Sequence, residues 1–123
     1  MIGKVCTFLT PYYDIRQQKN SFKQRPVLVV GKADSGDFNV LPISTVSNRA
    51  NVDAHYDFLL DPVVYPLLQL RSKSYLRVHK QTVVNQASFG LVLGDMKTDY
   101  PELYMTVLIK LEDFQKNLIE NAL

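Results

Sequence analysis

The stretch QRPVLVVGKADSGDFNVLPIS, residues 24–44, contains two aliphatic runs joined by a polar turn. Residues 27–30 (VLVV) are rich in β-branched side chains and predict a buried strand, and residues 38–43 (FNVLPI) predict the strand that returns beside it. The sequence between them, KADSGD at 32–37, has the Asp, Ser and Gly that tight turns favour. The stretch therefore predicts a β-hairpin at the centre of the fold.

An arginine and a proline stand at the entrance of the first strand. Pro26 has no N–H to give to a ladder, so the first position of a strand suits it. Its ring also favours an extended backbone at Arg25, which makes the anchor of the arginine stiffer than that of most loop residues. A cation at the mouth of a buried strand has either an ordinary surface role or a specific role in a cleft.

The rest of the sheet is expected on both sides of this hairpin. Residues 3–9 predict a first strand that ends at Thr10-Pro11, and residues 12–24 predict a long polar loop. Residues 53–60 predict a strand, the two prolines within 61–70 argue against regular structure throughout, and residues 89–95 predict a short strand or a turn. Residues 74–82 (SYLRVHKQT) alternate as a strand does, with Leu76 and Val78 on one face and Arg77 and His79 on the other.

The C-terminal segment is the clearest helix in the sequence. Asp99 is the expected N-cap, with Glu102 three residues later and Pro101 in the first turn. One apolar stripe with helical spacing is expected to pack on the sheet: Leu103, Val107, Leu111, Phe114 and Leu118. Short strands followed by one helix predict an α+β domain with a strongly curved sheet or partial barrel.

Size and composition narrow the class of protein. A chain of 123 residues, 46% hydrophobic and 21% charged, predicts one globular domain over residues 1–123. Cys6 is the only cysteine, which excludes an internal disulfide and indicates a reducing compartment. No apolar run approaches the roughly 20 residues of a membrane span, and the first residues do not have the layout of a signal peptide. We therefore expect a soluble, cytoplasmic protein with no membrane partner.

The net charge of +2 hides an uneven distribution. Residues 1–32 carry six basic side chains against Asp14 alone, and residues 69–82 carry four basic side chains and no acid. The intervening residues 33–68 carry five aspartates against Arg49, and residues 83–123 are also acidic on balance. Two basic blocks that fold together would form one positive face for a phosphate-bearing partner, whereas either block alone is more typical of a solvated loop.

Several kinds of site are poorly supported by the sequence. The two histidines and one cysteine have no metal-ligand spacing, no GxSxG elbow marks a nucleophile, and no glycine-rich loop of the phosphate-binding type is present. We therefore expect no metal and no cofactor. Basic residues interleaved with Tyr12, Tyr13, Phe22 and Tyr75 remain, and this combination holds single-stranded RNA by phosphate contacts and base stacking.

Motifs in the same order resemble the MazF/PemK (Kid) family, the toxins of bacterial toxin–antitoxin pairs. GKVCTFLTP is similar to the opening strand of the family, QRPVLVV to its basic-RPV-aliphatic signature, and VLPIS to its strand that ends in a hydroxyl residue. SYLRVHKQT and FGLVLGDM followed by a helix are similar to later elements, so that the resemblance covers most of the chain. It implies a CcdB-like fold, an SH3-like twisted antiparallel barrel with a C-terminal helix, that works as a homodimer.

The resemblance also implies an activity: metal-independent endoribonuclease cleavage of single-stranded RNA (mRNA), with a separate antitoxin protein as inhibitor. The catalytic arginine of the family corresponds to Arg25, and its hydroxyl partner corresponds to Ser44 or the adjacent Thr45. A guanidinium stays charged and can donate two parallel hydrogen bonds to phosphate oxygens, which suits Arg25 to stabilising the transition state in which a 2′-oxygen attacks phosphorus. The other side chains expected to bind RNA are Lys19, Lys23, Gln24, Arg77, His79, Lys80 and Gln81.

Two other functions fit the same fold. A CcdB-like poison of DNA gyrase would act through the end of the C-terminal helix, here residues 118–121 (LIEN), rather than through Arg25. A non-catalytic SH3-like binding module would explain the fold but not the Arg-Pro element.

Overall fold

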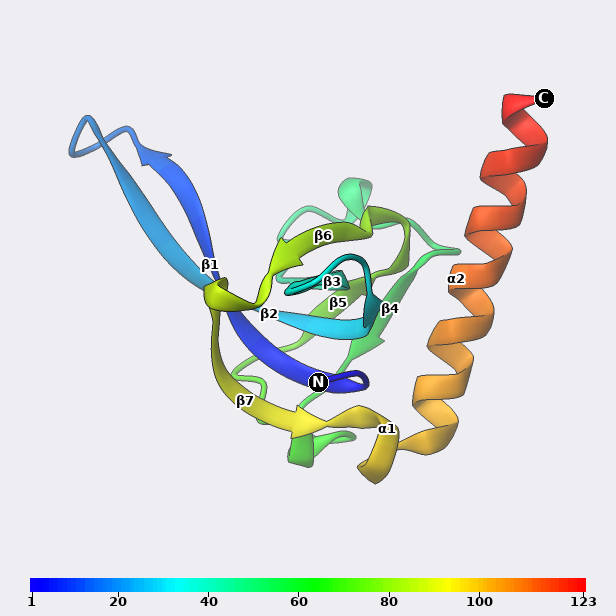
Figure 1. Ribbon diagram of the computed structural model, residues 1–123. Coiled ribbons are helices and arrows are strands. Elements are labelled where there is room, and N and C mark those ends of the chain that lie inside the picture. Colours follow the sequence, from blue (N-terminus) through cyan, green and yellow to red (C-terminus); the bar gives the residue numbers. More distant parts are fainter.

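The computed structural model describes residues 1–123 as a curled antiparallel sheet with a long C-terminal helix beside it (Figure 1). The strands are β1 (Lys4–Asp14), β2 (Lys19–Lys32), β3 (Asp37–Ser44), β4 (Asp57–Leu60), β5 (Ser74–Arg77), β6 (Thr82–Asn85) and β7 (Phe89–Asp95). The α-helices are α1 (Met96–Asp99) and α2 (Pro101–Ala122), and the 3₁₀ helices are η1 (Arg49–Asn51), η2 (Pro66–Leu68), η3 (Val78–Lys80) and η4 (Gln86–Ser88). The expected α+β class is confirmed.

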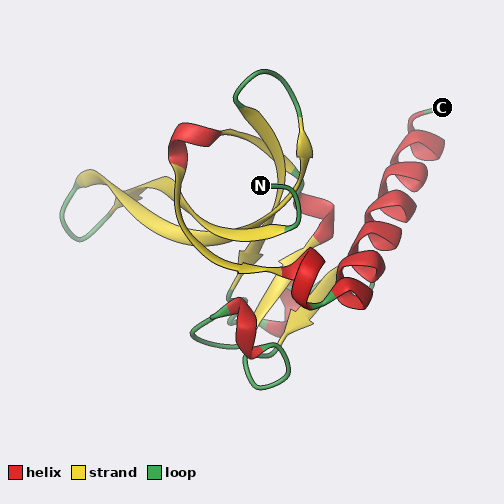
Figure 2. Ribbon diagram, turned by 60° about the horizontal axis from the view of Figure 1, so that its bottom comes forward, coloured by secondary structure: helices red, strands yellow, loops and turns green.

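Strand β3 pairs with two different strands along one edge, and this curls the sheet into a half-barrel. The strand order is β4-β5-β3-β2-β1-β7, and β6 pairs with β3 outside this path. The first half of β3, residues 37–40, pairs with β6, whereas its last two residues, Ile43 and Ser44, pair with β5. Because one strand serves two partners along the same edge, the sheet bends around its own interior, as Figure 2 shows.

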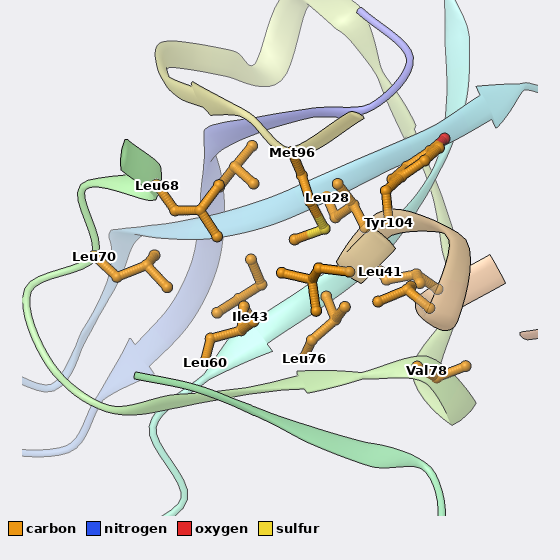
Figure 3. Close-up of a cluster of buried hydrophobic side chains, with 13 residues drawn as sticks. Leu28, Leu41, Ile43, Leu60, Leu68, Leu70, Leu76, Val78, Met96 and Tyr104 are labelled. Atoms are coloured by element: carbon orange, nitrogen blue, oxygen red, sulfur yellow. The ribbon is translucent and has the colours of Figure 1, made fainter. Parts of the chain in front are cut away.

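The interior is divided into two apolar clusters, one on each side of β2. Leu28 belongs to a cluster of 13 buried residues that also holds Leu41, Leu76 and Tyr104 (Figure 3). Val27 and Val29, which point to the other face, belong to a cluster of six. A strand buried on both faces needs an unbroken aliphatic run, which is why residues 27–30 do not alternate with polar ones. The predicted central hairpin is confirmed.

The predicted long loop at 12–24 is wrong. Strand β1 does not end at Thr10-Pro11 but continues to Asp14, and β2 begins at Lys19, with Tyr12 opposite Ser21 and Asp14 opposite Lys19. These residues form a two-stranded arm that projects from the barrel (Figure 1). The carboxylate of Asp14 accepts the N–H groups of Arg16 and Gln17 at 3.0 and 3.1 Å and closes the turn. Because neither face of the arm is buried, its sequence lacks the alternation by which strands are recognised.

Pro26 is not the first residue of its strand. It lies inside β2, opposite Thr7 of β1. The ladder with β3 begins one residue later, at the pair of Val27 and Pro42. The edge of β2 that faces β3 is therefore unpaired at Pro26, and the missing N–H of the proline costs no ladder hydrogen bond there.

Two predicted strands are shorter than expected, because local hydrogen bonds replace the ladder. In 53–60 only β4 is extended; before it, the carboxylate of Asp53 accepts the N–H groups of His55 and Tyr56, both at 2.9 Å, in a turn. In 74–82 the strand ends at Arg77, where its partner β4 begins, and η3 follows with buried Val78. Residues 61–70 are irregular and residues 89–95 form a strand, as the sequence predicts.

Helix α2 begins at Pro101, which lies in the first turn as expected, but the N-cap differs from the prediction. Asp99 is the last residue of α1 and not the N-cap of α2, which is Tyr100. The apolar stripe is core only in its first half: Leu103 and Val107 are buried and Phe114 is half-buried, but Leu118 is 57% exposed because the helix runs past the barrel (Figure 1). None of the helices combines the length and apolar composition that a membrane span requires.

A buried carboxylate ties β4 to β5. The side chain of Asp57 is fully buried and accepts hydrogen bonds from Arg77 Nε at 3.1 Å and from the N–H of Asp53 at 2.8 Å. We predict that Asp57→Ala lowers the free energy of unfolding by about 3–5 kcal/mol, because it leaves the Arg77 charge without its buried partner. Urea denaturation measures this loss. Glu120→Ala, at an exposed helix position, is the control, and an equal loss in both variants would contradict the role of Asp57.

Two carboxyl groups make the stability of the fold depend on pH in the acidic range. The side-chain hydrogen bond with His55 Nε2, 2.9 Å away, lowers the pKa of Asp113, and the N–H groups of Tyr56 and His55 lower the pKa of Asp53, each from an ordinary value of 3.8. The unfolded chain therefore binds these protons more readily, and the stabilisation, fully present above the ordinary pKa, is lost as the pH falls through the lowered values. We predict that Asp113→Asn flattens the decline in stability measured between about pH 5 and pH 2.5. An unchanged decline would assign it to other groups.

Candidate functional site

A polar cleft opens where the projecting arm joins the barrel. Its volume is about 330 Å³, and eight residues line it: Lys23, Gln24, Arg25 and Pro26 of β2, Ile43 and Ser44 of β3, the following Thr45, and Ser74 of β5. We call it the Arg25 cleft. The three side chains predicted to be catalytic, Arg25, Ser44 and Thr45, thus line one cleft together with two that were predicted to bind RNA, Lys23 and Gln24.

The register of β2 and β3 explains why Arg25 and Ser44 meet. The last ladder pair at this end is Val27 opposite Pro42. Continued for two more residues, the same register sets Arg25 across from Ser44. At this point, however, β3 leaves β2 and pairs with β5, Ser44 lying opposite Tyr75. The two strands diverge, and the gap between them becomes the cleft.

The electrostatics of the cleft are those of an anion site. The side chain of Arg25 is exposed and forms no ion pair or hydrogen bond with the rest of the chain. Lys23 contributes a second cation, whose Nζ lies 4.8 Å from the centre of the Tyr12 ring. No Asp or Glu lines the cleft. Two cations and three hydroxyl groups without a carboxylate favour a ligand that carries negative charge.

A second cleft adjoins the first. It has a volume of about 400 Å³ and shares Gln24, Pro26, Thr45 and Ser74 with the Arg25 cleft. Its other walls come from β1, from the segment 69–72 and from β7, and they include Arg71 and no acidic side chain. We call it the Arg71 cleft. Another cavity, of about 470 Å³, lies elsewhere, at the start of α2, and is lined in part by Asp99 and Glu102, so it does not suit an anion.

The remaining residues predicted to bind RNA lie outside both clefts. Lys19 is at the outer end of the arm, opposite Asp14. Arg77 binds Asp57, and the ring of His79 packs against those of Tyr56 and Phe114, with ring centroids 6.2 and 6.4 Å away.

Residues 79–81, at the end of the segment 74–82, are also held partly by polar contacts and burial within the fold. Gln81 bonds with Asn39 at 2.9 Å and Gln115 at 2.8 Å, whereas Lys80 forms no side-chain hydrogen bond or ion pair. The Nδ1 atom of His79 is buried without a hydrogen-bond partner, 3.7 Å from Asp57 Oδ1. Arg77 and His79 do lie near each other, but β5 ends at Arg77 and His79 belongs to η3, and both groups face the buried carboxylate of Asp57. Their contact with RNA stays a prediction.

Sequence reasoning missed several side chains that line the clefts, among them Arg71 and Ser74. Ser74 lines both clefts, and its hydroxyl donates to the carbonyl of Ser72 at 3.0 Å. The second basic block, residues 69–82, was the available signal, and of its four cations only Arg71 lines a cleft. No group of three His, Cys, Asp or Glu side chains is placed to hold a metal ion.

Two comparisons with known proteins gave no match from which a function could be transferred. No family model matches the chain, and a search of curated proteins found no match. The function of the two clefts therefore rests on their geometry and charge.

Proposed function

We propose that the protein is a metal-independent endoribonuclease that cleaves single-stranded RNA, with the SH3-like barrel and toxin role of the MazF/PemK family. The observation that carries the proposal is the free guanidinium of Arg25 in a cleft that also holds Ser44 and Thr45 and lacks carboxylates. Messenger RNA is the proposed substrate, and the cytoplasm the proposed location.

The chemistry needs little more than this cleft supplies. The 2′-oxygen of a ribose attacks the adjacent phosphorus, a bond from phosphorus to the 2′-oxygen forms, and the bond to the 5′-oxygen breaks. The 2′-hydroxyl loses its proton and the 5′-oxygen gains one, which leaves a 2′,3′-cyclic phosphate and a 5′-hydroxyl. Negative charge gathers on the non-bridging oxygens, where Arg25 can donate two hydrogen bonds and a hydroxyl of Ser44 or Thr45 a third. Since neither imidazole nor carboxylate lines the cleft, charge stabilisation and positioning are the contributions we assign to it.

The arm supports a path for the RNA. Lys19, Lys23 and Arg25 are separated by even numbers of residues along β2, so their side chains emerge on the same face. At about 3.4 Å per residue they mark out about 20 Å leading into the cleft. Tyr12, opposite Ser21, stands on this face as well and offers a ring on which a base can stack. Beyond the clefts, Arg77, His79, Lys80 and Gln81 remain proposed contacts, with Lys80 the freest of the four.

Arg25→Ala tests the proposed reaction. Incubated with a long single-stranded RNA in EDTA, the native chain should give discrete fragments that end in 2′,3′-cyclic phosphate. The variant should cut on the order of 10²–10³-fold more slowly, because one preorganised donor to the transition state is lost. Arg49→Ala is the matched control, since Arg49 lines neither cleft. Intact RNA with the native chain, or equal rates for native and Arg25→Ala, would contradict the proposal.

Helix α2 supports the proposed homodimer. Its face away from the barrel carries the exposed apolar residues Met105, Ile109 and Ile119, and Leu123 follows at its C-cap, with Glu112 and Lys116 in between. Their spacings of 4, 3, 4, 3 and 4 residues are those of a helix–helix seam. The order is also self-complementary. When two copies of the helix pair antiparallel, with the two-fold axis at the level of residue 114, Met105 faces Leu123, Ile109 faces Ile119 and Glu112 faces Lys116. Each contact then occurs twice, as a two-fold interface requires.

Charge exchange tests this pairing. We predict that Glu112→Lys and Lys116→Glu each shift the native chain from dimer to monomer in light scattering after size-exclusion chromatography, because like charges then face each other twice. The double variant restores opposite charges and should restore the dimer. A native chain that stays monomeric, or a dimer that ignores the single changes, would contradict an interface on α2.

An inhibitor and an alternative function complete the proposal. An acidic antitoxin segment could occupy the positive clefts, because carboxylates can take the place of phosphates there. The alternative, a gyrase poison, is favoured by one observation: Leu118 and Ile119 are exposed near the end of α2, where such contacts would lie. Inhibited supercoiling with intact RNA would support that function instead.

A further inference from the structure

The Arg71 cleft has the mixed lining of a site for a small, partly polar group. Pro26, Leu70, Leu91 and Leu93 supply apolar surface, and polar side chains surround it: Thr7, Gln24, Thr45, Gln69, Arg71, Ser72 and Ser74. Small-molecule sites in proteins combine these two features, with apolar walls for contact area and a few polar groups for orientation. The side chain of Arg71 is exposed and forms no hydrogen bond or ion pair within the chain, so all its donors are available.

The segment that carries Arg71 is fixed to the barrel. The Gln69 side-chain amide donates to the carbonyl of Leu93 at 2.6 Å, and Leu68 is fully buried. Gly94 of β7 permits the close approach of the backbone at Leu67, because a Cβ at residue 94 would lie 2.5 Å from the carbonyl oxygen of Leu67.

Gln69 itself has a left-handed backbone, with φ of 53°, which is uncommon for a residue other than glycine and is often found at ligand sites. Its side chain is held by the amide nitrogen, so its amide oxygen stays free to accept a hydrogen bond. The cleft therefore presents a fixed acceptor beside the donors of Arg71.

We propose that the Arg71 cleft seats one unpaired nucleobase of the RNA, next to the scissile phosphate in the Arg25 cleft, and that Arg71 is the residue that determines base specificity. The inference rests on the proposed function. Four shared residues join the two clefts, which is the arrangement that a nucleotide needs when its phosphate lies in one and its base in the other. Unpaired bases are read by hydrogen bonds on their edges, and a guanidinium can make two in parallel.

Cleavage of a random-sequence RNA pool tests the base site. The native chain should show a strong preference for one base at one position beside the cut. Arg71→Ala should weaken that preference about tenfold, the typical worth of a bidentate contact to a base, and leave the other positions unchanged. Arg71→Lys separates recognition of the base from attraction to phosphate, because lysine keeps the positive charge but lacks the two parallel donors of the guanidinium. This variant should cut efficiently with the same weakened base preference. Arg49→Ala is the control.

Unchanged base frequencies in Arg71→Ala, or native frequencies in Arg71→Lys, would overturn the inference. To separate it from the proposed cleavage, we measure binding with fluorescently labelled short RNAs that differ in a single base, using the Arg25→Ala chain. This chain should bind the best and worst RNA about tenfold apart, and the double variant with Arg71→Ala should bind them equally. Base discrimination that depends on Arg71 in a protein that never cuts RNA would retain the base site and discard the nuclease; cutting without such discrimination would do the reverse.

Discussion

Strand β3 pairs with β2 only as far as Pro42 and then turns to β5, and the rest of the molecule depends on this divergence. It gives one strand three neighbours and thereby curls the sheet into a half-barrel. It also frees the edge of β2 at the point where Pro26 has no N–H to offer. Beyond that point β2 keeps its partner β1, with Phe8 opposite Arg25, but has none on the β3 side, so Arg25 borders an open cleft there. Ser44 is turned toward the same opening by the register that the two strands shared before they parted.

Charge is distributed over the fold according to what each group can pair with. Around Asp57 a carboxylate, a guanidinium and an imidazole are gathered in a buried cluster that joins β4, β5 and η3. Around the clefts, by contrast, Arg25 and Arg71 have no acidic neighbour in the lining. Because burying a charge without a partner is costly, Asp57 and Arg77 are paired with each other, whereas the arginines of the clefts can remain unpaired only because water or a ligand reaches them. That difference separates cations that hold the fold from cations that are available for binding.

The projecting arm and the far end of α2 show a second use of exposed surface. Both extend beyond the barrel (Figure 1), and both carry apolar side chains in solvent, among them Phe22 on the arm and Ile119 on the helix. The arm presents aromatic and basic groups together, which suits a polyanion with unpaired bases. The helix presents a self-complementary order of apolar and charged groups, which suits a second copy of itself.

The sequence by itself determined the elements whose pattern follows from local physics. Residues 27–30 are aliphatic and residues 38–43 mostly apolar because the hairpin packs against an apolar cluster on each side, and Pro101 and the spacing from Leu103 mark the helix. It could not reveal the arm at 12–24, whose strands have no buried face, or the ends of β4 and β5, which depend on where a partner strand stops. Arg25 and Ser44 were proposed as a pair from resemblance, but Arg71 was one basic residue among four in its block. Only the tertiary structure decided which of these cations are paired with a carboxylate, because the partner can be distant in the sequence. Asp57 lies 20 residues from Arg77, which it pairs with, whereas Arg71 has no carboxylate in its cleft.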